Sequence, residues 1–205
     1  VVFALYEDQA WVFWIGTADG LNTFDRETGQ FTRYKNDPNN PNSLSANEVR
    51  SIYGDQSGTL WIGTFGGGLN RFDRKTQQFF HYQYDPQDPD SLSQQEIRAI
   101  YQDRSEIIWV GTNLGGLNKF TQQQKFFHYH QHPNNPNSLS DDHIFSFVED
   151  QAGVLWIGTW NGGVCRFTLS SGEARVFREG RDSLVPSTVR CIEVTRARVW
   201  IGTYQ

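Results

Sequence analysis

One tetrapeptide pattern recurs along the whole chain of 205 residues. Trp, then Ile or Val, then Gly and Thr follow one another at Trp14, Trp61, Trp109, Trp156 and Trp200, with spacings of 47, 48, 47 and 44 residues. A second marker, Ser-Leu, precedes four of these tryptophans by 17 or 18 residues and begins at Ser43, Ser91, Ser138 and Ser183. Two markers with one period predict an array of stacked structural repeats.

Each repeat is expected to form four short β-strands. In the repeat at residues 46–84 we expect strands at 49–53, 59–64, 69–73 and 78–84. These segments are rich in aromatic and β-branched residues and are bounded by Gly, Pro, Asn or Asp. No segment shows a sustained helical period. Four strands in about 47 residues predict one β-propeller blade.

The predicted fold is therefore all-β, with antiparallel four-stranded blades, four of them complete and a fifth partial. The blades are expected at about 1–36, 46–84, 94–131 and 141–178, with the partial blade at 187–205. They are expected to form a single repeat region, and the incomplete array suggests a piece of a longer sensor. The recurrent tryptophan is expected to fill the space between neighbouring blades.

The composition narrows the classes of partner. The 23 acidic residues outnumber the 18 Lys and Arg, giving a net charge of −5, and nucleic-acid binders usually carry a basic stripe instead. No apolar run approaches the ~18 residues that cross a bilayer as a helix. The 30 aromatic residues indicate a folded chain, because disordered chains contain few of them. We therefore expect neither a nucleic-acid partner nor a membrane span in this chain.

The repeat unit from Asn47 to Ser93 combines an Asp turn, Leu-Trp-Ile-Gly-Thr, three glycines, Phe-Asp, and a Pro-containing loop that ends in Ser-Leu-Ser. This unit resembles the two-component regulator propeller repeat. The resemblance implies the extracytoplasmic, periplasmic sensor of a receptor with a histidine kinase, a hybrid kinase or a diguanylate cyclase outside this chain. It also implies a small polar ligand such as an oligosaccharide, no cofactor, and neighbouring propeller or β domains of the same receptor as partners. A homodimer is one possible assembly.

Strand alternation places the loop after each second strand and the loop before each first strand on one face, here called the loop face. Aromatic rings there can stack on sugars, while Asn and Arg donors fix their orientation. The candidate ligand-binding residues are Arg50, Phe65, Arg98, Asn113, Trp160, Asn161 and Arg190. Asp19, Leu114 and Phe145 are expected on the same face. In the alternative interpretation, the arginines brace neighbouring blades by bonding loop carbonyls.

Other polar motifs are interpreted as structural. The turn aspartates should accept backbone N–H bonds of their own turns, since glycosidase chemistry needs two converging carboxylates. The loops at 37–42 and 85–90 lack the spacing of a calcium loop. Alternation would put three histidines on one side of an outermost strand, but the aligned positions in other repeats suggest a solvated strand face. These histidines are His128, His130 and His132. We expect neither a metal site nor catalytic residues.

Two alternatives to a sensor remain open. One is a propeller lyase or hydrolase with a metal-assisted site at the central mouth, for which His143 is the candidate residue. The other is a protein-interaction scaffold. Cys191 is interpreted as a packing residue, because it continues a column of small residues in the first strands, and Cys165, in an Asn position of the repeat, is interpreted as another lone thiol.

Overall fold

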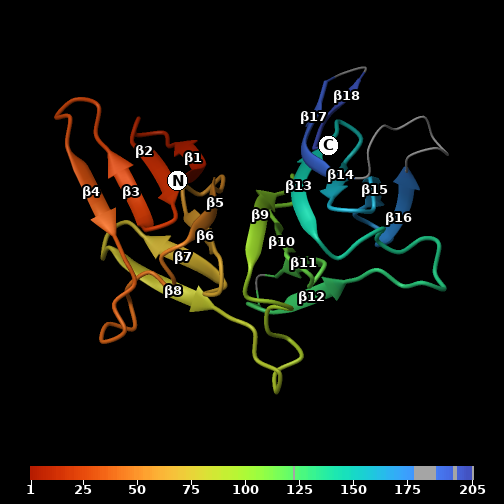
Figure 1. Cartoon of the computed structure of the whole chain (residues 1–205), viewed down its shortest axis with the longest axis horizontal. Coiled ribbons are helices and arrows are strands. Elements are labelled where there is room, and N and C mark those ends of the chain that lie inside the picture. The colour runs from red at the N-terminus through yellow and green to blue at the C-terminus, as the bar shows by residue number, and fades with distance from the viewer. Residues whose placement is uncertain (122, 178–187, 196–197, 205) are drawn as a thin grey trace. The chain divides into compact units, whose positions relative to one another are not determined.

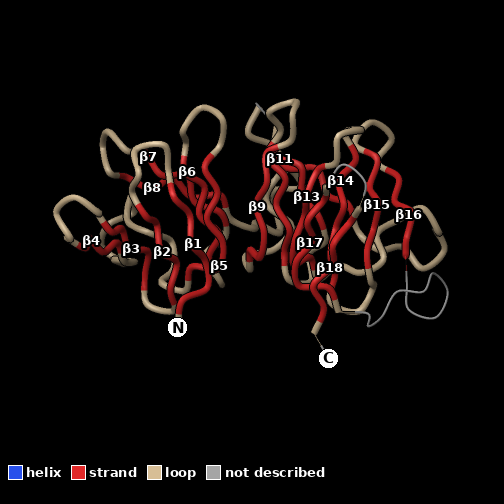
Figure 2. The backbone as a smooth tube through the Cα atoms, turned by 90° about the horizontal axis from the view of Figure 1, so that it is seen from above, coloured by secondary structure: helices blue, strands red, loops and turns tan. Residues whose placement is uncertain are grey.

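The computed structural model describes residues 1–121, 123–177, 188–195 and 198–204. These ranges contain strands and loops and no helix, as Figure 2 shows. They therefore contain no long apolar helix of the kind that crosses a lipid bilayer. The expected Ser-Leu marker at Ser183, and the expected blade bounds at residues 178 and 187, lie outside the described residues.

In the described part of the chain, four sheets of four antiparallel strands and one sheet of two strands follow one another in sequence (Figure 1). The first sheet contains β1 (Val2–Glu7), β2 (Phe13–Thr17), β3 (Gly20–Phe24) and β4 (Phe31–Tyr34). The second contains β5 (Val49–Gly54), β6 (Leu60–Thr64), β7 (Leu69–Asp73) and β8 (Gln78–Tyr82). The third contains β9 (Ile97–Gln102), β10 (Ile108–Thr112), β11 (Leu117–Phe120) and β12 (Phe126–Tyr129).

The fourth sheet contains β13 (Ile144–Glu149), β14 (Val154–Thr159), β15 (Val164–Thr168) and β16 (Glu173–Phe177), and the last pairs β17 (Val189–Val194) with β18 (Val199–Thr203). Each four-stranded sheet keeps its strands in sequence order, as expected of a meander. The predicted all-β class, with four four-stranded blades and a partial fifth, is confirmed. The single repeat region stays a prediction, and the chain divides into two compact units, Val1–Ile100 and Tyr101–Gln205.

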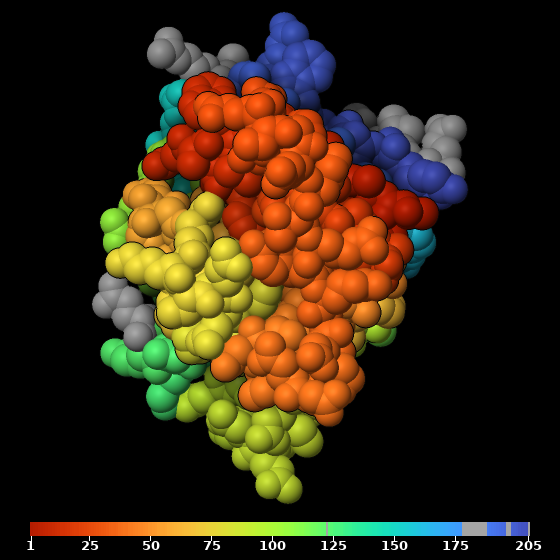
Figure 3. Space-filling view, turned by 90° about the vertical axis from the view of Figure 1, so that its left-hand side faces the viewer, coloured from red at the N-terminus to blue at the C-terminus, as the bar shows by residue number. Residues whose placement is uncertain are grey.

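The core of the first unit is built between the first and second sheets. The indole of Trp14 in the first repeat meets the ring of Phe72 in the second, edge to face, with centroids 5.4 Å apart. Leu44, the Leu of the first Ser-Leu pair, is fully buried beside them. Figure 3 shows one surface of this unit, with the first repeat in red and orange. Trp14 therefore fills the space between neighbouring blades, as predicted.

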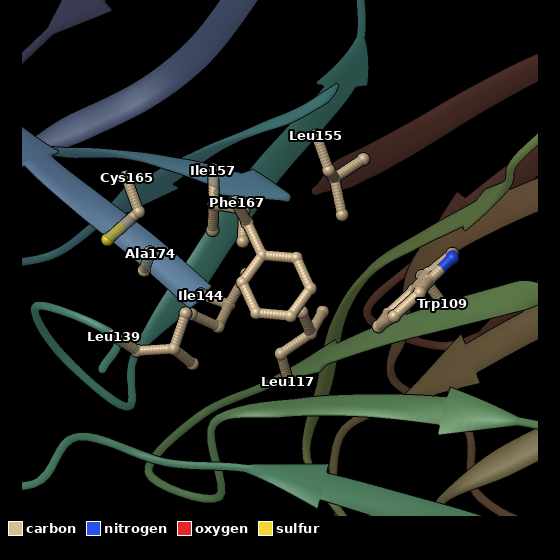
Figure 4. Packing of buried hydrophobic residues seen from close by; sticks show 9 residues of the cluster. All are labelled: Trp109, Leu117, Leu139, Ile144, Leu155, Ile157, Cys165, Phe167 and Ala174. Carbon is tan, nitrogen blue, oxygen red and sulfur yellow. The ribbon is translucent and has the colours of Figure 1, made fainter. Parts of the chain in front are cut away.

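The core of the second unit repeats this arrangement. Trp109 of the third repeat meets Phe167 of the fourth, with ring centroids 5.7 Å apart and planes inclined at 73°. Leu139, from the third described Ser-Leu pair, and the thiol of Cys165 close the same cluster (Figure 4). Rings in this edge-to-face geometry contribute about 0.5–1.5 kcal/mol beyond their burial. Trp14 and Trp109 therefore act as contacts between consecutive repeats, whereas Trp200, in the last sheet, is 55% exposed and departs from the prediction.

The Gly of the tetrapeptide lets consecutive sheets approach closely. A Cβ atom at Gly111 would lie 2.6 Å from Cγ2 of Ile144, the first residue of the next repeat's first strand. At Gly158 it would lie 2.7 Å from Cγ1 of Val189, in the same position. In the four complete repeats the Thr after this Gly fixes the following loop, because its hydroxyl donates to a loop carbonyl, as Thr159 does to Gly163 at 3.0 Å.

The Ser of the Ser-Leu pair closes the Pro-containing loop. The Oγ atom of Ser43 accepts the N–H of Asp37 at 2.9 Å and donates to its carbonyl at 3.1 Å. Ser91 makes the same two bonds with Asp85, both at 3.0 Å. The structural interpretation of these loops is therefore confirmed by their own hydrogen bonds.

Candidate functional site

A β-bulge shapes the start of the first strand in the repeats. The pairing register shifts between the first and third residues of β1, β5, β13 and β17, so the second residue of each strand stands at the irregularity. A bulge redirects a side chain and is frequent beside functional sites. The four residues so placed are Phe3, Arg50, Phe145 and Arg190, and Arg98 is second in β9. Three of the predicted arginines thus occupy one position of the repeat.

The two loops predicted to share a face are joined by hydrogen bonds. The N–H of Phe65, just after β6, donates to the carbonyl of Glu48, just before β5, at 2.8 Å. Trp160 makes the same bond with His143 at 3.2 Å. These bonds confirm, within each unit, that the loop after the second strand lies beside the entry of the first.

In the first unit, four side chains form what we call the first-unit cluster: Phe3, Arg50, Phe65 and Arg98. The guanidinium carbon of Arg50 lies 3.9 Å from the ring centroid of Phe3 and 5.4 Å from that of Phe65. Arg98 approaches the same Phe65 ring at 5.6 Å. The structure thus brings together the three predicted residues of this unit, with Phe65 37% exposed.

The positive charge of Arg50 is compensated within its own repeat. Its Nε–H donates to Oε1 of Glu48 at 2.6 Å, and an Nη atom forms a salt bridge with the same oxygen. Glu48 stands two residues before Arg50, so the pair spans the entry of β5. This contact occupies one guanidinium edge, but it is not the bond to a loop carbonyl of a neighbouring blade that the bracing interpretation expects.

In the second unit, Arg190 is surrounded by three aromatic rings. We call Arg190 and the residues that carry these rings, Phe145, Trp160 and Tyr204, the second-unit cluster. The guanidinium carbon lies 4.5 Å from the centroid of Phe145, 4.9 Å from that of Trp160 and 5.6 Å from that of Tyr204. The rings of Phe145 and Trp160 themselves lie 5.5 Å apart. Arg190 is exposed and Tyr204 is 62% exposed.

A carboxylate holds the loop beside this cluster. Oδ2 of Asp141 accepts the backbone N–H of Asn161 at 2.7 Å, and Oδ1 accepts the N–H of His143 at 2.9 Å. The imidazole Nδ1 of His143 lies 2.8 Å from the same Oδ1. Asp141 therefore fixes the backbone that carries Trp160, and the side chain of Asn161 is exposed next to the rings.

The remaining predicted residues lie near the loop face in other settings. Asn113 follows β10 and is half-buried, and Leu114 beside it is 60% exposed with a φ of 80°. Asp19 pairs with the Nζ of Lys35 at 2.6 Å, and this hydrogen bond lowers the pKa of its carboxyl group. Asp19 is therefore engaged in an ion pair within the first repeat.

Sequence reasoning missed two members of the clusters, Phe3 and Tyr204. Both are equivalent to candidate residues in other repeats: Phe3 aligns with Arg50, and Tyr204 aligns with Phe65 and Trp160. A full alignment of the repeats by position would have identified both from the sequence.

The Asp turns do more than predicted. Oδ1 of Asp150 accepts the backbone N–H groups of Ala152 and Val154, as expected, at 2.9 and 3.1 Å. Its second oxygen, Oδ2, accepts the indole N–H of Trp156 at 2.9 Å. The same indole bond recurs at 2.7–2.8 Å in the other complete repeats, from Trp14 to Asp8, Trp61 to Asp55 and Trp109 to Asp103. The carboxylate thus connects the turn to the interblade ring.

These hydrogen bonds govern the acidity of the turn aspartates. Burial alone would raise the pKa of Asp150, but the bonds from Trp156, Val154 and Ala152 outweigh burial and leave the pKa below its ordinary value. Asp8 shows the same balance, with Arg74 as an additional donor at 2.6 Å, and its pKa is also lowered. Both carboxylates are therefore committed to structure.

Two cavities of about 300 Å³ lie at this end of the strands, away from the loop face. One, of 310 Å³, is lined by Asp150, Trp156 and Arg198, and the other, of 300 Å³, by Tyr6, Asp8 and Arg74. Sequence reasoning did not foresee them. Because their carboxylates already accept indole and backbone donors, neither cavity offers a free acid or base at Asp8 or Asp150.

The histidine cluster differs from its prediction. Strand β12 ends at Tyr129, so His130 and His132 fall in the following loop and strict alternation stops before them. Within the described ranges, no three His, Cys, Asp or Glu side chains are arranged to hold a metal ion.

The two cysteines are free, and one differs from the prediction. Cys165 is buried, and its Sγ lies 2.9 Å from Oγ of Ser140, in the position where Asn70 bonds Ser45. Cys191 was expected to be packed but is exposed. In the four complete repeats, a Cβ at the tetrapeptide Gly would contact a Val or Ile in the first strand of the next repeat. A Cβ at Gly202 would contact Cys191 only.

Comparison with solved structures gives the same fold. The extracellular domain of BT3049 from B. thetaiotaomicron, assigned as a hybrid two component system, is 30% identical with a TM-score of 0.85, covering 98% of this chain and 27% of that one. The extracellular domain of BT4673 from the same organism is 21% identical with a TM-score of 0.57, covering 99% and 34%. The chain thus spans about a third or less of these domains.

An enzyme also shares the fold. A catalytically inactive virginiamycin B lyase from Staphylococcus aureus, solved with quinupristin, is 18% identical with a TM-score of 0.64, covering 89% of this chain and 57% of that one. At this identity the likeness concerns the fold alone.

The sequence matches a family pattern but no single curated protein. The family pattern described as "Two component regulator propeller" matches residues 43–66, 91–114 and 138–161. Each match runs from a Ser-Leu marker to the second residue after the strand that carries the Trp. In these three segments the chain therefore carries the two component regulator propeller repeat.

Proposed function

We propose that this chain is part of the ligand-sensing, extracytoplasmic propeller region of a two-component signalling receptor. The observation that carries the proposal is the similarity to the BT3049 extracellular domain over 98% of the chain at 30% identity. In this proposal the region lies in the periplasm and its partners are neighbouring propeller or β domains of the same receptor. The whole chain of 1–205 forms one repeat region in the parent, and a homodimer is the assembly to test.

The proposed ligand is a small polar molecule such as an oligosaccharide, bound on the loop face. Two features support this placement. Arginine and aromatic side chains gather there at the bulge position of each unit. Rings stack on the apolar faces of sugars, and the planar guanidinium donates in fixed directions. Asn113 and Asn161 provide further amide groups on the same loops.

A panel of neutral and acidic oligosaccharides tests the proposal through the shift of the melting temperature. A bound ligand stabilises the folded state by RT ln(1 + [L]/Kd), about 2.7 kcal/mol at a hundredfold excess over Kd. Any active sugar is then titrated against Arg98→Ala, in the first-unit cluster, and Trp160→Ala, in the second-unit cluster. The variant in the cluster that holds the sugar is expected to bind at least about tenfold more weakly.

The matched control is Arg71→Ala. Arg71 also covers a phenylalanine ring, Phe80, at 4.7 Å, but on β7 and β8 away from the loop face. Its replacement should leave the affinity unchanged. Unchanged affinity in both loop-face variants, or a panel without any active sugar, would contradict the proposed site.

The enzyme alternative has its own test, because His143 and Asp141 form a close polar pair. A screen for lyase and hydrolase turnover, with and without EDTA, is expected to show none. Metal-dependent turnover that His143→Ala abolishes would replace the sensor proposal with an enzyme.

A further inference from the structure

The two clusters differ in charge balance. In the first-unit cluster, Glu48 stands two residues before Arg50 and accepts its Nε–H at 2.6 Å. In the second-unit cluster, the same position before Arg190 is occupied by Thr188, which is uncharged and whose carbonyl accepts the N–H of Tyr204. Arg50 therefore has a carboxylate partner at this position of its repeat, and Arg190 does not.

Asp141, an acid of the neighbouring loop, already has its own hydrogen-bond partners. Both oxygens of Asp141 accept backbone N–H groups, from His143 and from Asn161, and Oδ1 also meets the imidazole. Its side chain is only 12% exposed. Asp141 thus organises the loop of Trp160.

The three rings fix how Arg190 can be used. Phe145, Trp160 and Tyr204 lie 4.5–5.6 Å from the guanidinium carbon, in the range of cation–π contacts. Contacts with ring faces leave the guanidinium N–H groups in its plane for a forked partner, and a carboxylate matches that fork. The exposed Tyr204 and Asn161 add donors and acceptors for hydroxyl groups.

We propose that the second-unit cluster binds the carboxylate of an acidic sugar, a uronate unit of an oligosaccharide, with Arg190 as the carboxylate-binding residue. The inference rests on the proposed function and specifies its ligand class. Trp160 and Tyr204 pack against the sugar ring while Arg190 receives the acid. The first-unit cluster, in which Glu48 compensates Arg50, is not the carboxylate site.

Isothermal titration of the whole chain tests the proposal with three kinds of probe. The first is a set of uronate trisaccharides built from galacturonate, glucuronate or mannuronate, the second the corresponding neutral trisaccharides, and the third citrate, a carboxylate without a sugar. We expect at least one uronate trisaccharide to bind at least about tenfold more tightly than its neutral counterpart and than citrate. Raising the salt concentration should weaken this binding.

Three variants assign the effect to the cluster. Arg190→Gln and Arg190→Lys should both weaken uronate binding at least about tenfold, because glutamine lacks the charge and lysine lacks the planar fork. Trp160→Leu should weaken uronates and neutral sugars alike, since it removes the stacking surface. Arg175→Gln, at a guanidinium that covers the ring of Phe177 on β16 of the same unit, should leave uronate affinity unchanged. Equal melting temperatures establish that the variants are folded.

The outcomes separate this inference from the proposed function. If a neutral trisaccharide binds and no uronate binds more tightly, the carboxylate assignment is wrong while ligand sensing stands. If uronates bind but Arg190→Gln has no effect, or citrate binds equally well, the acidic-sugar site is wrong. If no sugar in either set binds, both proposals fail.

Discussion

Single residues in this chain have roles that repeat from unit to unit, and the turn aspartate shows this most clearly. One carboxylate oxygen serves the turn backbone, and the other serves the indole of the interblade tryptophan. Hydrogen bonds to a charged group contribute about 1.5–3 kcal/mol each. The Asp and Trp of the repeat therefore form one unit of stability, which explains why they share a period.

Asp150→Asn is expected to lower the free energy of unfolding by about 1–3 kcal/mol at neutral pH, because its amide NH₂ cannot accept the indole N–H of Trp156. Urea denaturation measures this change. Asp25→Asn is the control, since that carboxylate caps an exposed turn through the N–H groups of Glu27 and Thr28. An equal loss in both variants would contradict the role of the indole bond.

The lowered pKa values of Asp8 and Asp150 give stability a defined pH dependence. A carboxyl group whose pKa is lower in the folded state binds protons more readily when unfolded, so its contribution is full above the unfolded value. That contribution should be lost as the pH falls below about 4. Melting curves from pH 6 to pH 3 should show this loss, and Asp150→Asn should make it shallower.

Backbone conformation also varies at one turn position. Gly58 and Gly153 have φ values of 82° and 75°, and Glu106 takes the same place with 64°. The left-handed region costs a residue with a side chain about 1–2 kcal/mol. Glu106→Gly should therefore raise the free energy of unfolding by up to about 1 kcal/mol in urea denaturation. Gly58→Glu should lower it, and the opposite signs would contradict this account.

Strands are held together across repeats by the glycine of the tetrapeptide. At Gly111 a methyl group would come within 2.7 Å of both Ile144 and Phe147 of the next sheet. Gly111→Ala is thus expected to cost about 1–3 kcal/mol through overpacking. Gly202→Ala, whose methyl group would contact only the exposed Cys191, should cost less when both are compared by thermal melting. Similar losses would show that packing between sheets is not the cause.

On the scale of the whole molecule, two cores are built in the same way from consecutive repeats. In repeat proteins, stability is close to a sum of unit and nearest-neighbour terms. Leu155→Ala removes a fully buried side chain of the second core and should cost about 2–5 kcal/mol. Hydrogen exchange should accelerate more in β13–β16 than in β1–β4, and a uniform increase would indicate a single cooperative unit.

Much of this fold could be predicted from the sequence, because its markers report local chemistry. The period located the strands of the repeat at 46–84 to within two residues, and the rings of Trp14 and Trp109 lie between sheets as predicted. The bulge that positions Arg50 and Arg190 could not be predicted, since it depends on the register between two strands. The prediction that Cys191 is packed was wrong, because it required contact with a further strand, whereas a Cβ at the neighbouring Gly202 would meet Cys191 only.

The candidate site was only partly predictable for the same reason. Residue types and loop positions identified Arg50, Phe65 and Arg98 as neighbours. Arg50 pairs with Glu48, whereas Arg190, at the same position of its repeat, is surrounded by aromatic rings. Both arrangements depend on side-chain geometry, which composition does not encode.

The bulge at the second residue of the first strand has an evolutionary consequence. Since the backbone there is set by register and by loop hydrogen bonds, the side chain can be exchanged among Phe and Arg without altering the sheet, as Phe3, Arg50, Phe145 and Arg190 demonstrate. Duplication of one repeat followed by substitution at this single position would diversify recognition while the scaffold is inherited intact. A combinatorial library restricted to these positions is thus a direct way to re-target such a protein.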